Sequence, residues 1–218
     1  MLDHVLGLGR KADDERRALR LEVSHGRQDV GVLGERELRR AAAAAGAAVT
    51  LVAGPVALPD PPGVKVIKVE SARDMLAAAQ ASLPADAAVF AAAVADWRAA
   101  EVGAQKIKKT GAAPQLALVE SPDILATIAQ RKSQRPHLVI GFAAETEHVI
   151  ANARAKRERK GCDWIVANDV SPSTGIMGGD RNTVHLVTGE GVESWPDEAK
   201  DDVAARLVAR IATALAAS

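Results

Sequence analysis

Short apolar runs alternate with amphipathic stretches along most of the chain. The apolar runs are bounded by Gly, Pro, Asp or Ser and predict buried strands. These strands are expected at 48–54, 64–69, 87–95, 137–144 and 163–169. Segments with a 3.6-residue period predict helices at 71–83, 121–132, 148–160 and 197–217. An alternating pattern around a glycine turn predicts a β-hairpin at 182–194.

Apolar strands that alternate with helices predict the class of fold. The expected architecture is α/β: a Rossmann-like, mostly parallel sheet with helices on both faces and a β-hairpin near the C-terminus. Two helix starts are visible in the sequence. Ser71 is expected as an N-cap with Asp74 in the capping-box position, and Ser121 as an N-cap with Pro122 at the first helical position.

The first part of the chain differs from the rest. Residues 1–40 contain 17 charged side chains, whereas residues 41–90 contain seven. This first part shows no clear strand and only patchy helical periodicity, which predicts helix or poorly ordered chain. We therefore divide the chain into a divergent or poorly ordered N-terminal segment, 1–45, and an α/β domain, 46–218.

Composition narrows the classes of function. The formal net charge is zero, which argues against a nucleic-acid partner. The uncharged stretch 41–58 is rich in weakly hydrophobic alanine and is interrupted by Gly and Pro, so it predicts a helix end, a turn and a strand rather than a membrane span. Cys162 is the only cysteine and no signal peptide is evident, so the cytoplasm is the expected compartment.

Parallel sheets bind ligands beyond the carboxyl ends of their strands. The side chains expected there are Asp96, Phe142, Glu145, Asn168 and Asp169. An acid in this position can bind a ribose hydroxyl or a metal that carries phosphates, although Asp96 could also cap the chain or pair with Arg98.

Three further motifs allow both a structural and a functional interpretation. The run "KIKK" (106–109) is either a solvated charge cluster or a set of phosphate-binding lysines. Pro122 and Asp123 are expected at the start of a helix. They either serve only to begin this helix, or they form a helix N-terminus whose free N–H groups bind a ligand. Lys156 and Lys160 lie four residues apart and share one helix face, which is either solvated or turned to a ligand.

Several enzyme classes lack their signatures here. The glycine patterns at 7–9 and 175–180 match no dinucleotide fingerprint, which disfavours an NAD or nucleotide-sugar enzyme. The chain has no tyrosine, which excludes a Tyr/Lys-type reductase, and it has neither a Walker loop nor a G-x-S-x-G motif. Nothing in the local sequence pairs Cys162 with a His or an acid, so we expect a small packed residue rather than a nucleophile.

Five motifs together resemble a known family. The stretches "AAAVADWRAAEVGAQKIKK", "SPDIL", "GFAAET", "AKRERKGCDWIVANDVS" and "GDRNTVHLV" follow the order and spacing of the phosphopantothenoylcysteine synthetase domain. In bacteria this domain is usually the C-terminal half of a bifunctional flavoprotein of coenzyme A synthesis. The resemblance covers residues 47–217. It implies a ligase that uses CTP and Mg²⁺ to join 4′-phosphopantothenate to cysteine through an acyl-cytidylate.

The resemblance also implies roles for individual residues. Lys106 would contact the reacting phosphate as the catalytic lysine, and Lys156 and Lys160 would bind the triphosphate. Phe142 would lie beside the base. The remaining nucleotide-binding residues would be Phe90, Ala91, Ala92, Asp96, Pro122, Asp123, Ile124 and Leu125. The family further implies a homodimer and a phosphopantothenoylcysteine decarboxylase as a fused or separate partner. No FMN is expected in this chain.

The N-terminal segment departs from the family. The synthetase domain opens with a G-G-T-type loop and later has an Asn-x-Ser-Ser-Gly-Lys-like loop, and residues 1–46 contain neither. Two hypotheses therefore stand at this point. One is an active ligase, and the alternative is a non-catalytic or truncated member of the family that binds nucleotide or dimerises.

Overall fold

A five-stranded sheet forms the centre of the molecule. The computed structural model describes residues 35–55, 59–91, 94–100, 117–171 and 180–217. The strands of this sheet follow the order β10-β9-β7-β6-β3. Their bounds are Ala87–Phe90 for β3, Leu138–Glu145 for β6, Trp164–Asp169 for β7, Val184–Val187 for β9 and Val192–Ser194 for β10. Strands β3, β6 and β7 are parallel, and the β9–β10 hairpin adds antiparallel strands at one edge.

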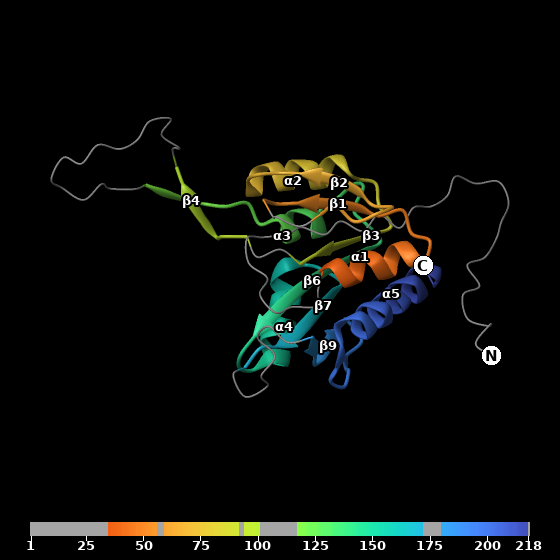
Figure 1. Ribbon diagram of the computed structural model, residues 1–218. Helices are drawn as coiled ribbons and strands as arrows, with labels where there is room; N and C mark the ends of the chain where they lie inside the picture. The colour runs from red at the N-terminus through yellow and green to blue at the C-terminus, as the bar shows by residue number, and fades with distance from the viewer. Residues whose placement is uncertain (1–34, 56–58, 92–93, 101–116, 172–179, 218) are drawn as a thin grey trace.

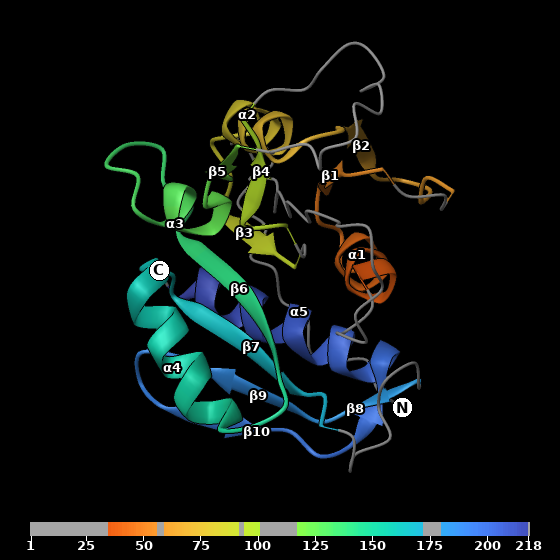
Figure 2. The same cartoon turned by 90° about the vertical axis from the view of Figure 1, so that its left-hand side faces the viewer.

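Helices cover both faces of this sheet (Figure 2). The helices are α1 (Glu35–Ala44), α2 (Ala72–Ala81), α3 (Ile124–Ala129), α4 (Val149–Lys160) and α5 (Lys200–Ala216). One hydrophobic cluster joins the sheet to α1 and α5, and the other joins it to α2, α3 and α4. Successive residues of β6 enter opposite clusters: Leu138 and Ile140 face α5, and Val139 faces the α3 side. The predicted class of fold is confirmed.

Among the described residues, three two-stranded sheets accompany the central one. Strands β1 (Thr50–Ala53) and β2 (Lys65–Lys68) pair in parallel. Strands β4 (Trp97–Ala99) and β5 (Leu118–Glu120) form an antiparallel ribbon that reaches out from the body of the molecule (Figure 1). Strands β8 (Arg181–Asn182) and β11 (Glu198–Ala199) pair near the start of α5. The sequence pattern did not predict β4, β5, β8 or β11.

The start of α2 is confirmed in atomic detail. Ser71 is the N-cap, and its side chain accepts a hydrogen bond from the backbone N–H of Asp74 at 3.2 Å. The Asp74 carboxylate accepts in return from the backbone N–H of Ser71 at 3.1 Å. These reciprocal bonds satisfy two N–H groups that have no partner within the helix, so the capping box fixes where α2 begins.

Two sequence expectations are wrong in their boundaries. Helix α3 begins at Ile124 with Asp123 as its N-cap, so Ser121 is not the cap and Pro122 lies outside the helix. The reason is that the Ser121 N–H donates to the Asp96 carbonyl at 2.7 Å, which continues the β4–β5 ribbon. The strand expected at 87–95 ends at Phe90, because it pairs with β6 only over Ala87–Phe90.

The uncharged stretch 41–58 folds as expected where the structure describes it. Helix α1 ends at Ala44, the chain turns at Gly46, and β1 begins at Thr50. In the described part of the chain, no helix is both long enough and apolar enough to cross a bilayer.

Gly141 couples the sheet to α3. A Cβ atom at this position would lie 2.6 Å from Leu125 Cδ2 and 2.9 Å from Ile165 Cδ1. We expect Gly141→Ala to lower the free energy of unfolding by about 1–3 kcal/mol, because the added methyl group overpacks the space under α3. Urea denaturation measures this loss. Gly189→Ala is the matched control, since its Cβ would meet only Arg157 Nη1 at 3.7 Å. Equal stability of both variants would contradict the close packing of α3 on β6.

Candidate functional site

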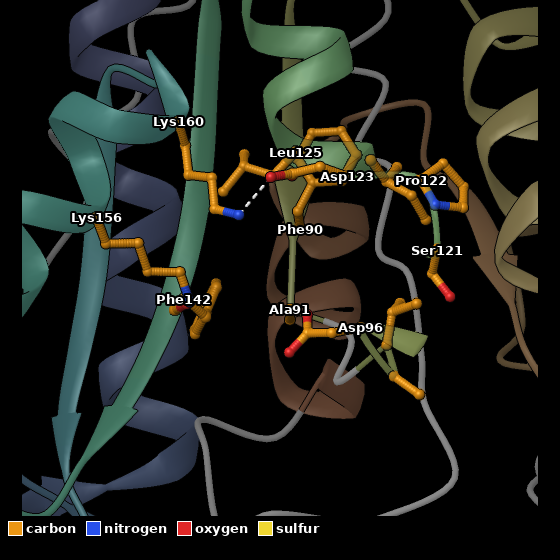
Figure 3. A pocket seen from close by; sticks show the side chains of 13 residues that line it. Phe90, Ala91, Asp96, Ser121, Pro122, Asp123, Leu125, Phe142, Lys156 and Lys160 are labelled. Carbon is orange, nitrogen blue, oxygen red and sulfur yellow. Dashed lines mark hydrogen bonds and ion pairs between the residues drawn. The ribbon is translucent and has the colours of Figure 1, made fainter. Parts of the chain in front are cut away.

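A pocket of about 210 Å³ lies at the carboxyl end of the parallel strands (Figure 3). Its wall comes from the end of β3, the segment before β4, the segment that leads into α3, strand β6 and helix α4. The lining residues are Phe90, Ala91, Val94, Ala95, Asp96, Ser121, Pro122, Asp123, Ile124, Leu125, Phe142, Lys156 and Lys160. The pocket is therefore where an open α/β sheet places its ligands.

The structure brings together, in this one pocket, every residue that the family resemblance assigned to the nucleotide site and that the structure describes. Residues from 90 to 160 that are distant in sequence meet at this one pocket. Ala92 and Lys106 lie outside the described residues. Sequence reasoning missed Val94, Ala95 and Ser121 as lining residues. Proximity in sequence could have indicated these three residues, since each lies within two residues of Asp96 or Pro122.

Apolar side chains form the floor of the pocket. Phe90 pairs with Gly141 across β3 and β6, so the next residue of β6, Phe142, lies on the other face of the sheet, and the two rings belong to different hydrophobic clusters. Each of these two aromatic side chains is only 7% exposed. Leu125 reaches the same floor from the first turn of α3. Apolar side chains at this end of the sheet can contact the ring of an aromatic ligand.

Helix α4 contributes two cations to the pocket. Lys156 and Lys160 are one helical turn apart, and both side chains point toward the pocket (Figure 3). The ammonium group of Lys156 donates to the backbone carbonyl of Phe142 at 2.7 Å. Burial lowers the pKa of Lys156, and the charge of Lys160 lowers it further, while Glu145 opposes the shift. An anion bound here would favour the charged form of Lys156.

Asp123 faces Lys160 across the pocket. The ammonium group of Lys160 forms an ion pair with Oδ2 of Asp123, and Oδ1 accepts the N–H of Ala126 at 3.0 Å. Burial alone would raise the pKa of Asp123, but the hydrogen bonds from Lys160 and Ala126 and the nearby positive charges outweigh it, so the pKa is lowered. Asp123 is therefore an ionised group at neutral pH. Its carboxylate already takes the N–H group that the sequence left open to a ligand.

Asp96 supplies a second carboxylate at the opposite side of the pocket (Figure 3). Its backbone carbonyl is fixed by the N–H of Ser121 at 2.7 Å. Arg98 donates to the carbonyl of Ala99 at 3.4 Å, and among the described residues the structure records no ion pair between Asp96 and Arg98. The local structural role considered for Asp96 is therefore not seen in this part of the chain.

Three other polar residues lie at the carboxyl ends of strands but do not line the pocket. Glu145 accepts a hydrogen bond from Asn152 at 3.1 Å, and Asp169 accepts the N–H of Ser171 at 2.9 Å. Asn168 is buried beside them at the end of β7. Over the described ranges, no group of three or more His, Cys, Asp or Glu residues is arranged to hold a metal ion.

Cys162 has the packed role that its sequence context indicated. It is buried, and burial raises the pKa of its thiol to about 11. Only a very small thiolate fraction exists at neutral pH, so this side chain is not an activated nucleophile.

The pocket can bind an anion that carries an aromatic ring. Two ammonium groups lie on one side, two buried aromatic rings form the floor, and a carboxylate lies opposite the ammonium groups. A lysine is a compact charge on a flexible stem, which suits phosphate oxygens. This combination is typical of a nucleotide site.

Comparison with known proteins gives the relatives of this chain. Residues 28–215 match the family described as "DNA/pantothenate metabolism flavoprotein C-terminal domain". The Coenzyme A biosynthesis bifunctional protein CoaBC of Escherichia coli K12 is 46% identical over 177 residues, which cover 79% of this chain and 43% of that protein. The protein of the same name from Mycobacterium bovis is 41% identical over 189 residues, which cover 81% of this chain and 45% of that protein. The chain spans less than half the length of these two curated relatives.

Solved structures show the same fold. The crystal structure of the C-terminal domain of a CoaBC protein superposes with a TM-score of 0.73 and 30% identity, and the match covers 91% of this chain and 96% of that one. The DNA/pantothenate metabolism flavoprotein from Streptococcus pneumoniae has a TM-score of 0.72 at 20% identity, which supports the fold alone.

Proposed function

Because this chain belongs to the DNA/pantothenate metabolism flavoprotein C-terminal domain family, we propose that it serves coenzyme A biosynthesis as a phosphopantothenate–cysteine ligase. In this proposal CTP activates 4′-phosphopantothenate, and cysteine then receives the acyl group. The relatives from Escherichia coli and Mycobacterium bovis carry the name of coenzyme A biosynthesis, which supports the metabolic role. The sequence motifs of the synthetase domain support the type of reaction.

The observation that carries the proposal is the convergence of Lys156 and Lys160 on the pocket at the carboxyl edge of the sheet. The pocket lies where this class of sheet binds ligands, and its cations match the charge of a triphosphate. Phe90 and Phe142 offer the nucleoside an apolar floor. The family resemblance assigns a nucleotide to these same residues.

The reaction requires two transfers. In the first, the carboxylate of 4′-phosphopantothenate attacks the α-phosphorus of CTP, and pyrophosphate leaves with its electron pair. In the second, the amino group of cysteine attacks the acyl carbon, CMP leaves, and the nitrogen loses a proton. Lys156 and Lys160 would hold the phosphates, and Lys106 would offset the charge that develops at the reacting phosphorus.

Magnesium would accompany the triphosphate. Mg²⁺ is usually bound by one or two carboxylates together with the phosphates of its substrate. Asp96 fits this need because its carboxylate lines the pocket opposite the two lysines (Figure 3). Asp123 fits less well because its oxygens already bind Ala126 and Lys160.

A second candidate function is favoured by one observation. Residues 1–46 contain neither of the two glycine-containing loops of the synthetase domain. A member without these loops could bind nucleotide, or dimerise, without completing the ligation. We further propose that the active form is a homodimer and that a phosphopantothenoylcysteine decarboxylase, fused or separate, supplies the other activity of the pathway.

Binding of CTP is expected to be stronger than binding of ATP. The pocket floor at Phe142 and the backbone before α3 would read the edge of the smaller base, and one unmatched hydrogen bond corresponds to about a tenfold difference in affinity. Calorimetric titration of the full chain with each nucleotide and Mg²⁺ measures the ratio. Equal affinities would leave a phosphate site without base selectivity, and absence of binding would contradict the proposal.

A further inference from the structure

We infer that Asp123 is an internal counter-ion for Lys160, which an incoming phosphate must displace, so that Asp123 weakens anion binding by the pocket. This inference deepens the proposed function and rests on its premise that the pocket takes a phosphate-bearing ligand. It gives the Asp123 side chain a role opposite to that of a ligand-binding group.

Asp123 is the fixed member of the ion pair. Its Oδ1 caps α3 through the Ala126 N–H, while its Oδ2 faces Lys160 (Figure 3). The backbone carbonyl of Asp123 also accepts from Thr127, at 2.9 Å from the amide nitrogen and 2.6 Å from the hydroxyl. Rotating the carboxylate away would therefore cost the helix its cap. Lys160 can move instead, because only its side-chain torsions need to change.

The ion pair is not needed to hold α3 against α4. Gln130 Nε2, just after α3, donates to the Lys160 carbonyl at 3.3 Å, and Arg135 Nη2 donates to the Gly161 carbonyl at 3.5 Å. Gly161 has a φ of +70°, so the helix ends there in a conformation that favours glycine. The backbone of Lys160 is thus positioned without help from Asp123. The pair is free to open without separating the two helices.

The pair is also accessible from solution. The Lys160 side chain is 22% exposed and the Asp123 side chain 43% exposed, so an anion that enters the pocket can reach the ammonium group. Lys156 differs, because it donates to the neutral carbonyl of Phe142. Asp123 therefore reduces the charge of the two-lysine group from +2 to +1. A phosphate must compete with Asp123 for the ammonium group of Lys160.

The test removes the charge and keeps the cap. Asn is as good an N-cap residue as Asp, so Asp123→Asn preserves the start of α3, and Asp123→Ser provides a second neutral cap should the first variant fail to fold. We expect either variant of the full chain to bind inorganic tripolyphosphate about three- to fivefold more tightly, the ratio that corresponds to a partly exposed ion pair. Glu158→Gln is the matched control, because it removes the same charge from an exposed position on α4 outside the pocket.

A double-mutant cycle with Lys160→Met tests whether Asp123 changes the affinity for tripolyphosphate through Lys160. If Asp123 acts through Lys160, Asp123→Asn should give little or no gain in the Lys160→Met background. Unchanged or weaker tripolyphosphate binding by the neutral variants would overturn the inference. An equal gain without Lys160, or no binding by any variant, would overturn it as well.

Parallel titrations with CTP and Mg²⁺ separate this inference from the proposed function. A gain for tripolyphosphate together with no binding of CTP would support the counter-ion and contradict the cytidine nucleotide. Binding of CTP by the parent chain, with no gain in Asp123→Asn, would leave the proposed function standing and overturn the counter-ion.

Discussion

Replacing Lys106 with Gln is expected to lower the rate of acyl-nucleotide formation by about 10²–10³-fold, the usual cost of removing one electrostatic contact to a developing charge. The family resemblance places this lysine at the reacting phosphorus, where pyrophosphate leaves. Gln keeps much of the length of the side chain and removes its charge. The fold should be unaffected, because the exchange replaces one polar side chain with another, and the described hydrophobic clusters consist of apolar side chains.

Pyrophosphate release with CTP, 4′-phosphopantothenate and cysteine measures this effect in any version of the chain that turns over. Lys132→Gln is the matched control, because Lys132 is exposed and does not line the pocket. A loss that is restricted to Lys106→Gln would support its assigned role. Equal rates for Lys106→Gln and the parent would remove Lys106 from the chemistry.

Restoring the family's two N-terminal loops is expected to raise ligase activity from little or none to a readily measured rate. Backbone N–H groups brought close by glycine are the usual cradle of a triphosphate, and residues 1–46 contain neither the G-G-T loop nor the Asn-x-Ser-Ser-Gly-Lys loop. The two lysines of α4 can attract the phosphates. We do not expect them to orient the α-phosphorus alone, because lysine offers a flexible point charge.

The structure indicates where such a graft should join the chain. Helix α1 contributes Leu38 and Ala42 to the same hydrophobic cluster as α5, so the family opening should replace residues before Glu35 and leave α1 intact. CTP-dependent pyrophosphate release by the parent and the graft gives the comparison. Full activity of the parent would show that the two loops are dispensable, and an inactive graft would favour the non-catalytic alternative.

The central fold could be predicted where one local signal dominates. Strands β6 and β7 are continuous apolar runs buried on both faces, and α2 begins at a complete capping box. The start of α3 could not be predicted from local chemistry. Ser121 and Asp123 are both good N-caps, and the choice depends on a hydrogen bond from Ser121 to Asp96, twenty-five residues earlier.

The ribbon formed by β4 and β5 was missed for a related reason. Trp97 and Leu118 are each 57% exposed, so no alternation between buried and exposed positions identifies the strands. The pairing of β4 with β5 joins segments that are about twenty residues apart, so it depends on tertiary structure and not on the local sequence. The apolar run at 87–95 predicts one longer strand, although the structure ends β3 at Phe90.

The described candidate residues line one pocket, and their role in binding a nucleotide stays a prediction, whereas their contacts with one another were not predictable from the sequence. The spacing of Lys156 and Lys160 placed them on one face, and the motifs of the family selected the other lining residues. The pairing of Lys160 with Asp123 joins residues 37 positions apart and depends on how α3 packs against α4. That contact determines the charge of the pocket, and it is visible only in the folded chain.

The most direct test of the central claim is a crystal structure of the full chain grown with millimolar CTP and Mg²⁺. We expect the cytosine ring against Phe142, the phosphates beside Lys156 and Lys160, and Lys160 released from Asp123. The contrary result is CTP bound at another surface while this pocket stays free of nucleotide. That result would contradict the assignment of this pocket to the ligation of 4′-phosphopantothenate to cysteine.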